Sequence, residues 1–309
     1  MRAPLKPPAL QSGSQIYIAS PASPADPERL GNGLAELARL GYRAAWQGGA
    51  SGPQGYFARP LEDRIVELER ALGGPEWSAV FCSRGGYGAT YVLDGLDPDP
   101  WPAPKIVLGY SDITSLEIFL WQKLGWVTFY GPMVASGFDA GPEAGYDAAS
   151  FTRAMTETRG GWSVGLHAES LVAGDVEGVL LGGCLTLVEA TLGTPWELDT
   201  RGAILLLEDY AVKPYQIDRM LMHLKQAGKF AGVRGVILGE FPGSEPPVAG
   251  GPTARDVTRR ILGELGVPVV WGAPVGHTPR PMLTLPLGVR ARLRAAATQL
   301  DILEPAVTA

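Results

Sequence analysis

The first 140 residues alternate short apolar runs with segments in which apolar residues recur at helical spacing. The apolar runs predict strands at Ile16–Ala19, Tyr42–Trp46, Ala79–Cys82, Ile106–Leu108 and Val127–Tyr130. Helices are predicted at Pro27–Leu40, Leu61–Leu72, after Gly86 and at Ile113–Leu124, with a glycine-rich loop at Gly48–Gly55. Such alternation is typical of a parallel sheet with crossover helices, so residues 1–140 are predicted to form an α/β domain.

The pattern weakens over residues 141–165, where Gly, Ala and Asp are frequent, and this segment is predicted to link two domains. Residues 166–309 mix both periodicities and are predicted to form a second domain. Its predicted strands are Val176–Leu181, Ala203–Leu207, Gly235–Leu238 and Val267–Trp271, and its predicted helices are Cys184–Leu192, Tyr215–Ala227 and Thr253–Leu265. Short hairpin strands are predicted near the end, at Leu283–Leu285, Val289–Leu293 and Leu300–Leu303.

The composition is that of a folded globular protein and excludes some classes of function. Hydrophobic residues make up 46% of the chain and charged residues 19%. The net charge of -6 argues against a nucleic-acid partner, because binding phosphates needs a basic surface. The N-terminal segment lacks the apolar core of a signal peptide, and the longest apolar runs are too short to span a bilayer. A cytoplasmic protein without membrane contact is therefore expected.

The few cysteines and histidines argue against a metal site. Cys82 and Cys184 both lie in apolar neighbourhoods, so two buried free thiols are expected. The sequence contains no CxxC or HExxH spacing and only three histidines. Neither a metal nor a cofactor is therefore expected.

Ser111 lies where an apolar strand pattern gives way at once to a helical one, in Gly109-Tyr110-Ser111-Asp112-Ile113. A serine on such a turn projects its hydroxyl at the carboxyl end of the sheet, where α/β proteins bind ligands. The amide of Asp112 could then donate to an oxyanion. The alternative is that Ser111 or Asp112 only caps the helix. The match to Gly-x-Ser-x-Gly is partial, because Ile113 replaces the second glycine.

A glycine-rich loop, Ser83-Arg84-Gly85-Gly86-Tyr87-Gly88, follows another predicted strand. Glycines let the backbone approach a ligand closely and direct N–H groups at an anion. The loop matches neither of the common nucleotide-binding glycine patterns. A second oxyanion donor from Gly85 or Gly86 fits at least as well as a phosphate site, and an ordinary tight turn is the third interpretation.

A serine nucleophile needs a base and a carboxylate that orients the base. His277 lies in a loop shaped by Gly and Pro, whereas His223 lies within a predicted helix and His167 has no strong context. Context therefore favours His277. Glu208 and Asp209 directly follow an apolar strand, and Glu208 is the better placed to be partly buried, although acids at strand ends often only cap helices.

Taken together, these motifs resemble the LD-carboxypeptidase family, which also includes the microcin C immunity peptidases. The resemblance runs in order from about Gln15 to Glu304. It rests on four motifs, Ser83–Gly88, Gly109–Thr114, Leu207–Asp209 leading to Ile217–Leu221, and Gly276-His277.

The resemblance implies a flavodoxin-like N-terminal domain with a parallel sheet and a smaller, β-rich α/β C-terminal domain. It implies a serine peptidase in which Ser111 is the nucleophile, His277 the base and Glu208 the orienting carboxylate. The implied oxyanion donors are the amides of Asp112 and of Gly85 or Gly86. Arg84 is a candidate for binding the substrate carboxylate, with a structural ion pair as an equal alternative, and Tyr87 is a further candidate substrate contact.

The implied activity is hydrolysis of the L,D-amide bond that releases terminal D-alanine from a murein tetrapeptide during peptidoglycan recycling, without a metal and commonly by a homodimer. The alternative within the family is an immunity-type peptidase that cleaves a peptidyl-nucleotide toxin. A ligand-binding protein without catalysis and a flavin or nucleotide module are alternatives from other classes. Gly182-Gly183-Cys184 stands where relatives often have Gly-Gly-Asn, which puts any hydrogen bond made by that amide in doubt.

Overall fold

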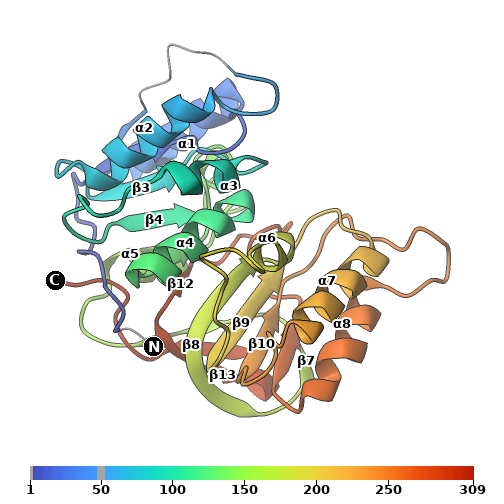
Figure 1. The fold of residues 1–309 in the computed structure, drawn as a ribbon. Coiled ribbons are helices and arrows are strands. Elements are labelled where there is room, and N and C mark those ends of the chain that lie inside the picture. Colours follow the sequence, from blue (N-terminus) through green and yellow to red (C-terminus); the bar gives the residue numbers. More distant parts are fainter. Residues whose placement is uncertain (1–2, 47–52) are drawn as a thin grey trace. The chain divides into compact units, whose positions relative to one another are not determined.

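The structure, a computed structural model, describes residues 3–46 and 53–309 and divides into two compact units. The first unit comprises Met1–Thr158, Arg280–Pro286 and Ala306–Ala309, and the second comprises Arg159–Pro279 and Leu287–Pro305. The chain therefore returns twice to the first unit near its C-terminus. Each unit is built around a sheet of its own (Figure 1). The glycine-rich loop predicted at Gly48–Gly55 lies largely outside the described residues.

The first unit contains a six-stranded sheet in the order β12-β5-β4-β3-β1-β2. Its strands are β1 (Gln15–Ala19), β2 (Arg43–Ala45), β3 (Ala79–Cys82), β4 (Ile106–Gly109), β5 (Thr128–Tyr130) and β12 (Leu285–Leu287). The first five pair in parallel in the order 2-1-3-4-5, which is the flavodoxin-like order. The predicted flavodoxin-like parallel sheet is confirmed. Because such strands are covered on both faces, β3 and β4 are buried at every position.

The helices of the first unit begin largely where the sequence predicts them. They are α1 (Pro27–Arg39), α2 (Leu61–Gly73), α3 (Ala89–Val92), α4 (Thr114–Leu124) and α5 (Ala148–Thr156), with 3-10 turns η1 (Leu93–Gly95), η2 (Ser111–Ile113) and η3 (Phe138–Ala140). The Asp26 side chain caps α1 by accepting from two backbone amides at 3.0 Å. Asp147 caps α5 in the same way, within a segment whose weak periodicity had predicted no element.

The strand predicted at Leu283–Leu285 was assigned to a C-terminal hairpin, and that assignment is wrong. The observed strand is β12, and it lies beside β5 at the edge of the first sheet. Its partner is more than 150 residues away in the sequence. A three-residue apolar run carries no local signal that specifies such a partner, because pairing between distant strands is decided by tertiary packing.

The second unit contains an eight-stranded mixed sheet in the order β6-β14-β13-β8-β9-β10-β11-β7. Its strands are β6 (Trp162–Gly165), β7 (Glu169–Val172), β8 (Asp175–Cys184), β9 (Ala203–Glu208), β10 (Gly235–Leu238), β11 (Val269–Trp271), β13 (Arg290–Arg294) and β14 (Gln299–Ile302). Strands β8 to β11 are parallel, and the outer pairs are antiparallel. The predicted β-rich α/β domain is confirmed. Parallel pairing puts the carboxyl ends of β8, β9 and β10 at one edge.

Helices of the second unit connect its parallel strands. They are α6 (Leu185–Ala190), α7 (Pro214–Gln226) and α8 (Ala254–Leu262), with 3-10 turns η4 (Gly263–Leu265) and η5 (Ala295–Ala297). Helix α7 packs beside both α6 and α8 (Figure 1). Among the described residues, no helix combines the length and the apolar character needed to cross a membrane.

The packing of α2 on the first sheet generates a stability prediction. Leu68 is completely buried on this helix, whereas Val66 is 65% exposed. Leu68→Ala should lower the free energy of unfolding by about 2–5 kcal/mol, because the lost contacts leave a cavity. Val66→Ala, the matched control, should change it by less than about 0.5 kcal/mol. Equal effects of the two substitutions in denaturant titrations would contradict this packing.

Candidate active site

Ser111 lies on the turn that connects β4 with η2 and α4. Its φ is +63°, in the left-handed region, where a residue other than glycine is strained by about 1–3 kcal/mol. The Ser111 amide donates to the hydroxyl of Tyr130, the last residue of β5, at 3.3 Å. No side-chain capping bond is made at the N-cap position of η2 or of α4. The predicted strand-to-helix turn is confirmed, and the alternative that Ser111 caps the helix is not.

The Asp112 side chain ties the serine turn to the start of α3. Its Oδ2 accepts from the backbone amide of Ala89 at 2.7 Å, at the start of α3. Burial raises the pKa of Asp112 to about 6, although the Ala89 bond and the nearby charge of Arg64 lower it. The backbone amide of Asp112 belongs to a first helical turn, whose N–H groups have no acceptor within the helix. It can therefore donate a hydrogen bond to a ligand.

Gly85 comes close to this turn. A Cβ placed on Gly85 would lie 3.0 Å from Ser111 Cβ, 3.2 Å from Ser111 Oγ and 3.4 Å from the Asp112 amide nitrogen. The loop is held by Ser23, whose amide donates to the Gly85 carbonyl at 3.2 Å and whose hydroxyl accepts from the Tyr87 amide at 3.1 Å. Two motifs that the sequence separates, the glycine-rich loop and the serine turn, are thus brought together.

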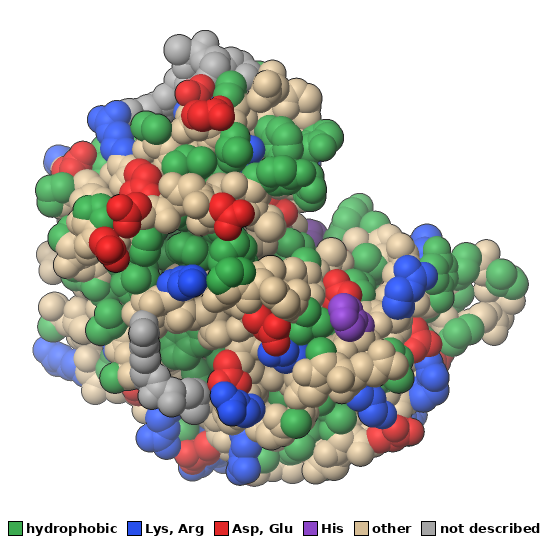
Figure 2. All heavy atoms as spheres, viewed as in Figure 1, with side chains coloured by type: hydrophobic (Ala, Val, Ile, Leu, Met, Phe, Trp, Pro, Cys, Tyr) green, Lys and Arg blue, Asp and Glu red, His purple; other side chains and the backbone are tan. Residues whose placement is uncertain are grey.

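The two candidate substrate contacts of this loop lie at the surface. Arg84 is exposed, and its Nη1 donates to the Pro24 carbonyl at 3.1 Å. Tyr87 is 47% exposed and belongs to a cluster of contacting aromatic rings formed with Tyr56, Phe57 and Tyr91. Figure 2 shows hydrophobic side chains gathered on this part of the first unit, near α3, among interspersed acidic and basic side chains.

In the second unit, Glu208 forms a hydrogen-bonded pair with the partly buried His277. Glu208 is the last residue of β9 and is completely buried. Its Oε2 accepts from both the backbone amide of His277, at 2.8 Å, and the ring Nδ1, at 2.9 Å. A carboxylate without water needs such donors, because an unpaired buried charge is strongly unfavourable. The two bonds determine which ring nitrogen carries the proton and leave Nε2 on the opposite side of the ring.

Gly276 makes this close approach possible. A Cβ there would lie 2.3 Å from the Glu208 carboxyl carbon, and the residue has a φ of +59°. Any other residue would therefore both clash with the buried carboxylate and strain the backbone. The position of the Glu208 carboxylate therefore explains why residue 276 is a glycine.

The electrostatic environment of His277 is set by acids. Burial opposes the charged ring and lowers the pKa of His277, but the charge and hydrogen bond of Glu208, with the charge of Asp209, together raise it above its ordinary value. The other two histidines lie elsewhere in the second unit. His223 lies on α7 and contacts Glu189 at 2.5 Å in an exposed pair. His167 lies in the turn between β6 and β7.

Asp209, the residue after Glu208, makes different contacts. Its Oδ2 accepts from the amide and hydroxyl of Thr186 at 2.8 Å and 2.6 Å, and its Oδ1 accepts from the Tyr210 amide. Cys184, at the end of β8, pairs in register with Glu208, and its thiol hydrogen-bonds with Asp209. Burial raises the pKa of this thiol well above its ordinary value, so it is not a reactive thiolate. Both cysteines are buried and free, as predicted.

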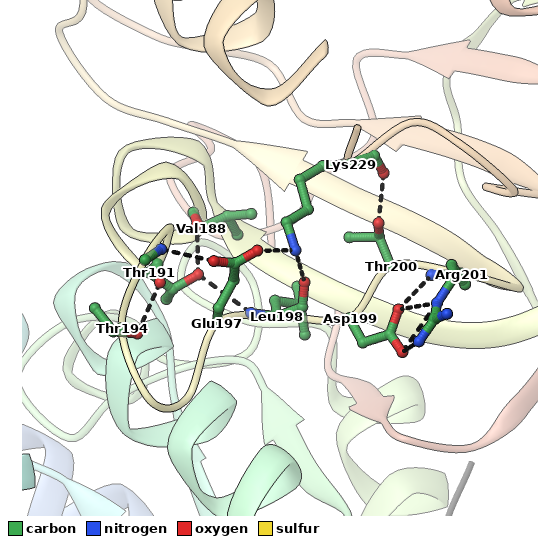
Figure 3. Close-up of polar contacts among 10 residues, drawn as sticks. Val188, Thr191, Thr194, Glu197, Leu198, Asp199, Thr200, Arg201 and Lys229 are labelled. Carbon is green, nitrogen blue, oxygen red and sulfur yellow. Dashed lines mark hydrogen bonds and ion pairs between the residues drawn. The ribbon is translucent and has the colours of Figure 1, made fainter. Parts of the chain in front are cut away.

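Polar residues between α6 and β9, drawn with Lys229 in Figure 3, help to line a separate hollow of about 320 Å³. Its lining residues are Glu197, Asp199, Thr200, Arg201, Ala227, Gly228 and Lys229. Lys229 pairs with Glu197, and Arg201 pairs with Asp199 at 2.7 Å, so each cation already faces a carboxylate. The hollow lies at the amino end of β9, whereas Glu208 lies at the carboxyl end. We therefore assign no catalytic role to the hollow. Within the described ranges, no cluster of His, Cys, Asp and Glu could hold a metal ion.

The sequence did not identify two aromatic residues that contact the candidate catalytic residues. Tyr130 accepts the hydrogen bond of the Ser111 amide, and the ring of Tyr210 stacks on that of His277. The sequence did contain a signal, because Tyr130 ends one apolar strand and Tyr210 follows another, and ligand sites of α/β proteins lie at the carboxyl ends of such strands.

The hydrogen-bonded pair of Glu208 and His277 generates a prediction about the titration of the histidine. In Glu208→Gln the pKa of His277 should fall, because the charge that stabilises the imidazolium is lost while the burial that opposes it remains. An NMR titration can follow it, since the chain has three histidines. Glu189→Gln, at the exposed His223 pair, is the control and should leave His277 unchanged. An unshifted His277 in Glu208→Gln would contradict the pairing.

Comparison with known proteins relates both units to one family. Residues 16–131 match the family model of the LD-carboxypeptidase N-terminal domain, and residues 177–293 match that of the C-terminal domain. The "Probable murein peptide carboxypeptidase" of Bacillus subtilis (strain 168) is 35% identical over 294 residues, covering 94% of this chain and 92% of the relative. The microcin C7 self-immunity protein MccF of Escherichia coli is 28% identical, covering 93% and 92%.

Solved structures lead to the same family. A muramoyltetrapeptide carboxypeptidase from Oxalobacter formigenes superposes with a TM-score of 0.84 at 32% identity, covering 96% of this chain and 100% of that one. MccF in complex with aspartyl sulfamoyl adenosine superposes with a TM-score of 0.91 at 26% identity, covering 99% and 100%. With both of its domains matched, this chain belongs to the LD-carboxypeptidase family.

Proposed function

We propose that this protein is a serine LD-carboxypeptidase that releases the terminal D-alanine of murein tetrapeptides by hydrolysing an L,D-amide bond. The observation that carries the proposal is the buried Glu208, whose Oε2 binds both the amide and Nδ1 of His277. This arrangement prepares an imidazole for general-base catalysis, in a family of carboxypeptidases. The similarity to a murein peptide carboxypeptidase and a muramoyltetrapeptide carboxypeptidase supports the choice of substrate.

In the proposed mechanism, Ser111 Oγ attacks the carbonyl carbon of the amide while His277 Nε2 takes the hydroxyl proton. The C–N bond then breaks, the proton passes to the nitrogen of the leaving D-alanine, and the peptide remains as an ester on Ser111. A water molecule attacks this ester and gives its proton to Nε2, which returns it to Ser111 Oγ. The mechanism requires Ser111 Oγ and His277 Nε2 to be within hydrogen-bond reach in the catalytic state.

Glu208 has two parts in this mechanism. Accepting from Nδ1, it keeps the proton off Nε2 in the resting enzyme, so that Nε2 can act as base. Its charge then stabilises the imidazolium that forms when Nε2 takes the serine proton. The raised pKa of His277 reflects this stabilisation of the imidazolium.

The backbone around Ser111 would stabilise the oxyanion. We assign the donors to the amide of Asp112 and to that of Gly85 or Gly86, because Gly85 lies beside Ser111 and Asp112. Each donor of this kind contributes about 3 kcal/mol to transition-state stabilisation.

A carboxypeptidase must also hold the free carboxylate of its substrate. We assign this role to Arg84, which is exposed in the loop next to the serine turn. A guanidinium has five N–H donors, and the Pro24 carbonyl accepts only from Nη1. The exposed ring of Tyr87, in the same loop, is the assigned contact for the rest of the substrate.

A second candidate substrate is a peptidyl-nucleotide toxin. It is favoured by the similarity to MccF, including a structure with bound aspartyl sulfamoyl adenosine. The same nucleophile and base would serve, since the bond is again an amide. A toxin-protection assay in cells, with wild type and Ser111→Ala, would detect this activity. The proposal further includes a cytoplasmic location and a homodimer, which fractionation and light scattering would test.

Ser111→Ala tests the nucleophile. The wild type should release D-alanine from a murein tetrapeptide, and Ser111→Ala should lose at least about a thousandfold in kcat because no acyl-enzyme can form. Circular dichroism and thermal unfolding should show the variant folded. A fluorophosphonate should label only the wild type. If Ser111→Ala keeps more than a few per cent of the activity, the assignment of the nucleophile is wrong.

The protonation of His277 predicts the pH dependence. The unprotonated ring is the base, so kcat/KM should rise as the pH rises through the pKa of His277, which lies above its ordinary value. In Glu208→Gln this limb should move to lower pH as the pKa falls, and the plateau should drop by roughly 10²–10⁴-fold. A limb that stays in place in Glu208→Gln would assign the titration to another group.

A further inference from the structure

The ring of Tyr210 covers one face of the His277 imidazole. The two ring centroids are 5.3 Å apart, and the planes are inclined by 28°. Tyr210 lies just after β9, two residues beyond Glu208. Its side chain is 59% exposed, whereas that of His277 is 19% exposed. A ring so exposed adds little to the core, so its position over the imidazole is not explained by burial.

The bonds to Glu208 hold the imidazole at one edge. Both bonds go to the same oxygen, Oε2, from the backbone amide and from Nδ1. They hold the Nδ1 edge of the ring, whereas a contact on the face of the ring acts on its tilt about that edge. The χ2 torsion of histidine is soft, without the sharp wells of an aliphatic torsion. A tilt would move Nε2, the atom that exchanges protons.

We propose that Tyr210 is a positioning residue that sets the plane of the His277 ring. The inference rests on the proposed function, in which His277 is the base. The stack restricts the tilt of the imidazole ring, so Nε2 keeps its direction through each proton transfer. The face of an aromatic ring also attracts a cation, so the stack favours the imidazolium that forms during the reaction.

Tyr210 is itself held in place by the loop that carries it. Its amide donates to Asp209 Oδ1 at 2.8 Å, and Asp209 Oδ2 is fixed by the amide and hydroxyl of Thr186. The next residue, Ala211, has a φ of +57°, and its amide donates to the Pro242 carbonyl at 2.8 Å. This strained turn directs the tyrosine back over the imidazole. Asp209 thus supports the stack, while Glu208 binds the imidazole directly.

The charged groups around His277 remain the same when Tyr210 is replaced. Glu208 and Asp209, at the end of β9, act on His277, and Glu240, after β10, accepts a hydrogen bond from the hydroxyl of the neighbouring Thr278. A substitution of Tyr210 therefore tests the ring itself and keeps these acids.

The kinetic test uses two substitutions of Tyr210 and a matched control. Tyr210→Leu removes the aromatic ring, and Tyr210→Phe keeps it without the hydroxyl. Tyr215→Leu is the control, because Tyr215 is 54% exposed in the same unit and lies at the start of α7. For D-alanine release, Tyr210→Leu should lower kcat about 3- to 30-fold and leave KM within about twofold, whereas Tyr210→Phe and Tyr215→Leu should keep kcat within about twofold.

A second readout does not depend on activity. The chain has three histidines, so the ring proton on Cε1 of His277 can be assigned by its loss in His277→Gln. A ring stacked on the imidazole should shift this resonance upfield. The shift should disappear in Tyr210→Leu and remain in Tyr210→Phe and Tyr215→Leu.

The outcomes separate the inference from the proposed function. Wild-type kcat in Tyr210→Leu, with Ser111→Ala and His277→Gln inactive, would overturn the inference and leave the proposed function standing. Equal losses in Tyr210→Phe and Tyr210→Leu would also overturn it, by assigning the effect to the hydroxyl. D-Alanine release by His277→Gln at the wild-type rate would remove the base from the proposed function, and the inference would fail with it.

Discussion

The second unit is organised around one interaction, the pair of hydrogen bonds that the buried Glu208 accepts from His277. A carboxylate with no exposed surface is tolerated only if charged or polar donors replace water. That requirement explains the neighbouring sequence. Gly276 has no Cβ because one would overlap the carboxylate, and Gly239 is restricted by the Glu208 Cβ, which a Cβ of its own would approach to 2.5 Å. The raised pKa of His277 is the electrostatic consequence of the same bonds.

The first unit has a corresponding constraint in the left-handed backbone of Ser111. A strained residue persists only where its surroundings hold it. Here the Tyr130 hydroxyl binds its amide, the Asp112 carboxylate ties the turn to α3, and Gly85 lies close against it. The parallel sheet makes this possible, because β3, β4 and β5 are neighbours and end at the same edge. These contacts hold the Ser111 hydroxyl in one place, as the proposed nucleophile requires.

Much of both units was predictable from local patterns. The apolar runs predicted β1, β3, β4 and β9 to within one residue or two at each end, since strands covered on both faces read as continuous apolar segments. The ordered motifs also identified the family. The edge strand β12 was placed in the wrong unit, and α5 was missed, because a three-residue strand and a nine-residue helix carry too few residues for a reliable pattern. Tyr130 and Tyr210 were missed because each contacts a residue of another part of the unit, Ser111 and His277 respectively.

The sequence by itself determined the alternation of strands and helices, the position of Ser111 at a strand-to-helix turn and the order of the family motifs. These features depend on residues close together in the chain, where periodicity and glycine placement act directly. Only the tertiary structure showed the two hydrogen bonds that join Glu208 to His277. A hydrogen bond such as that between Glu208 and His277 joins residues 69 positions apart, and no local pattern encodes it. Its existence depends on the pairing of the parallel strands that brings the end of β9 beside the loop after β11.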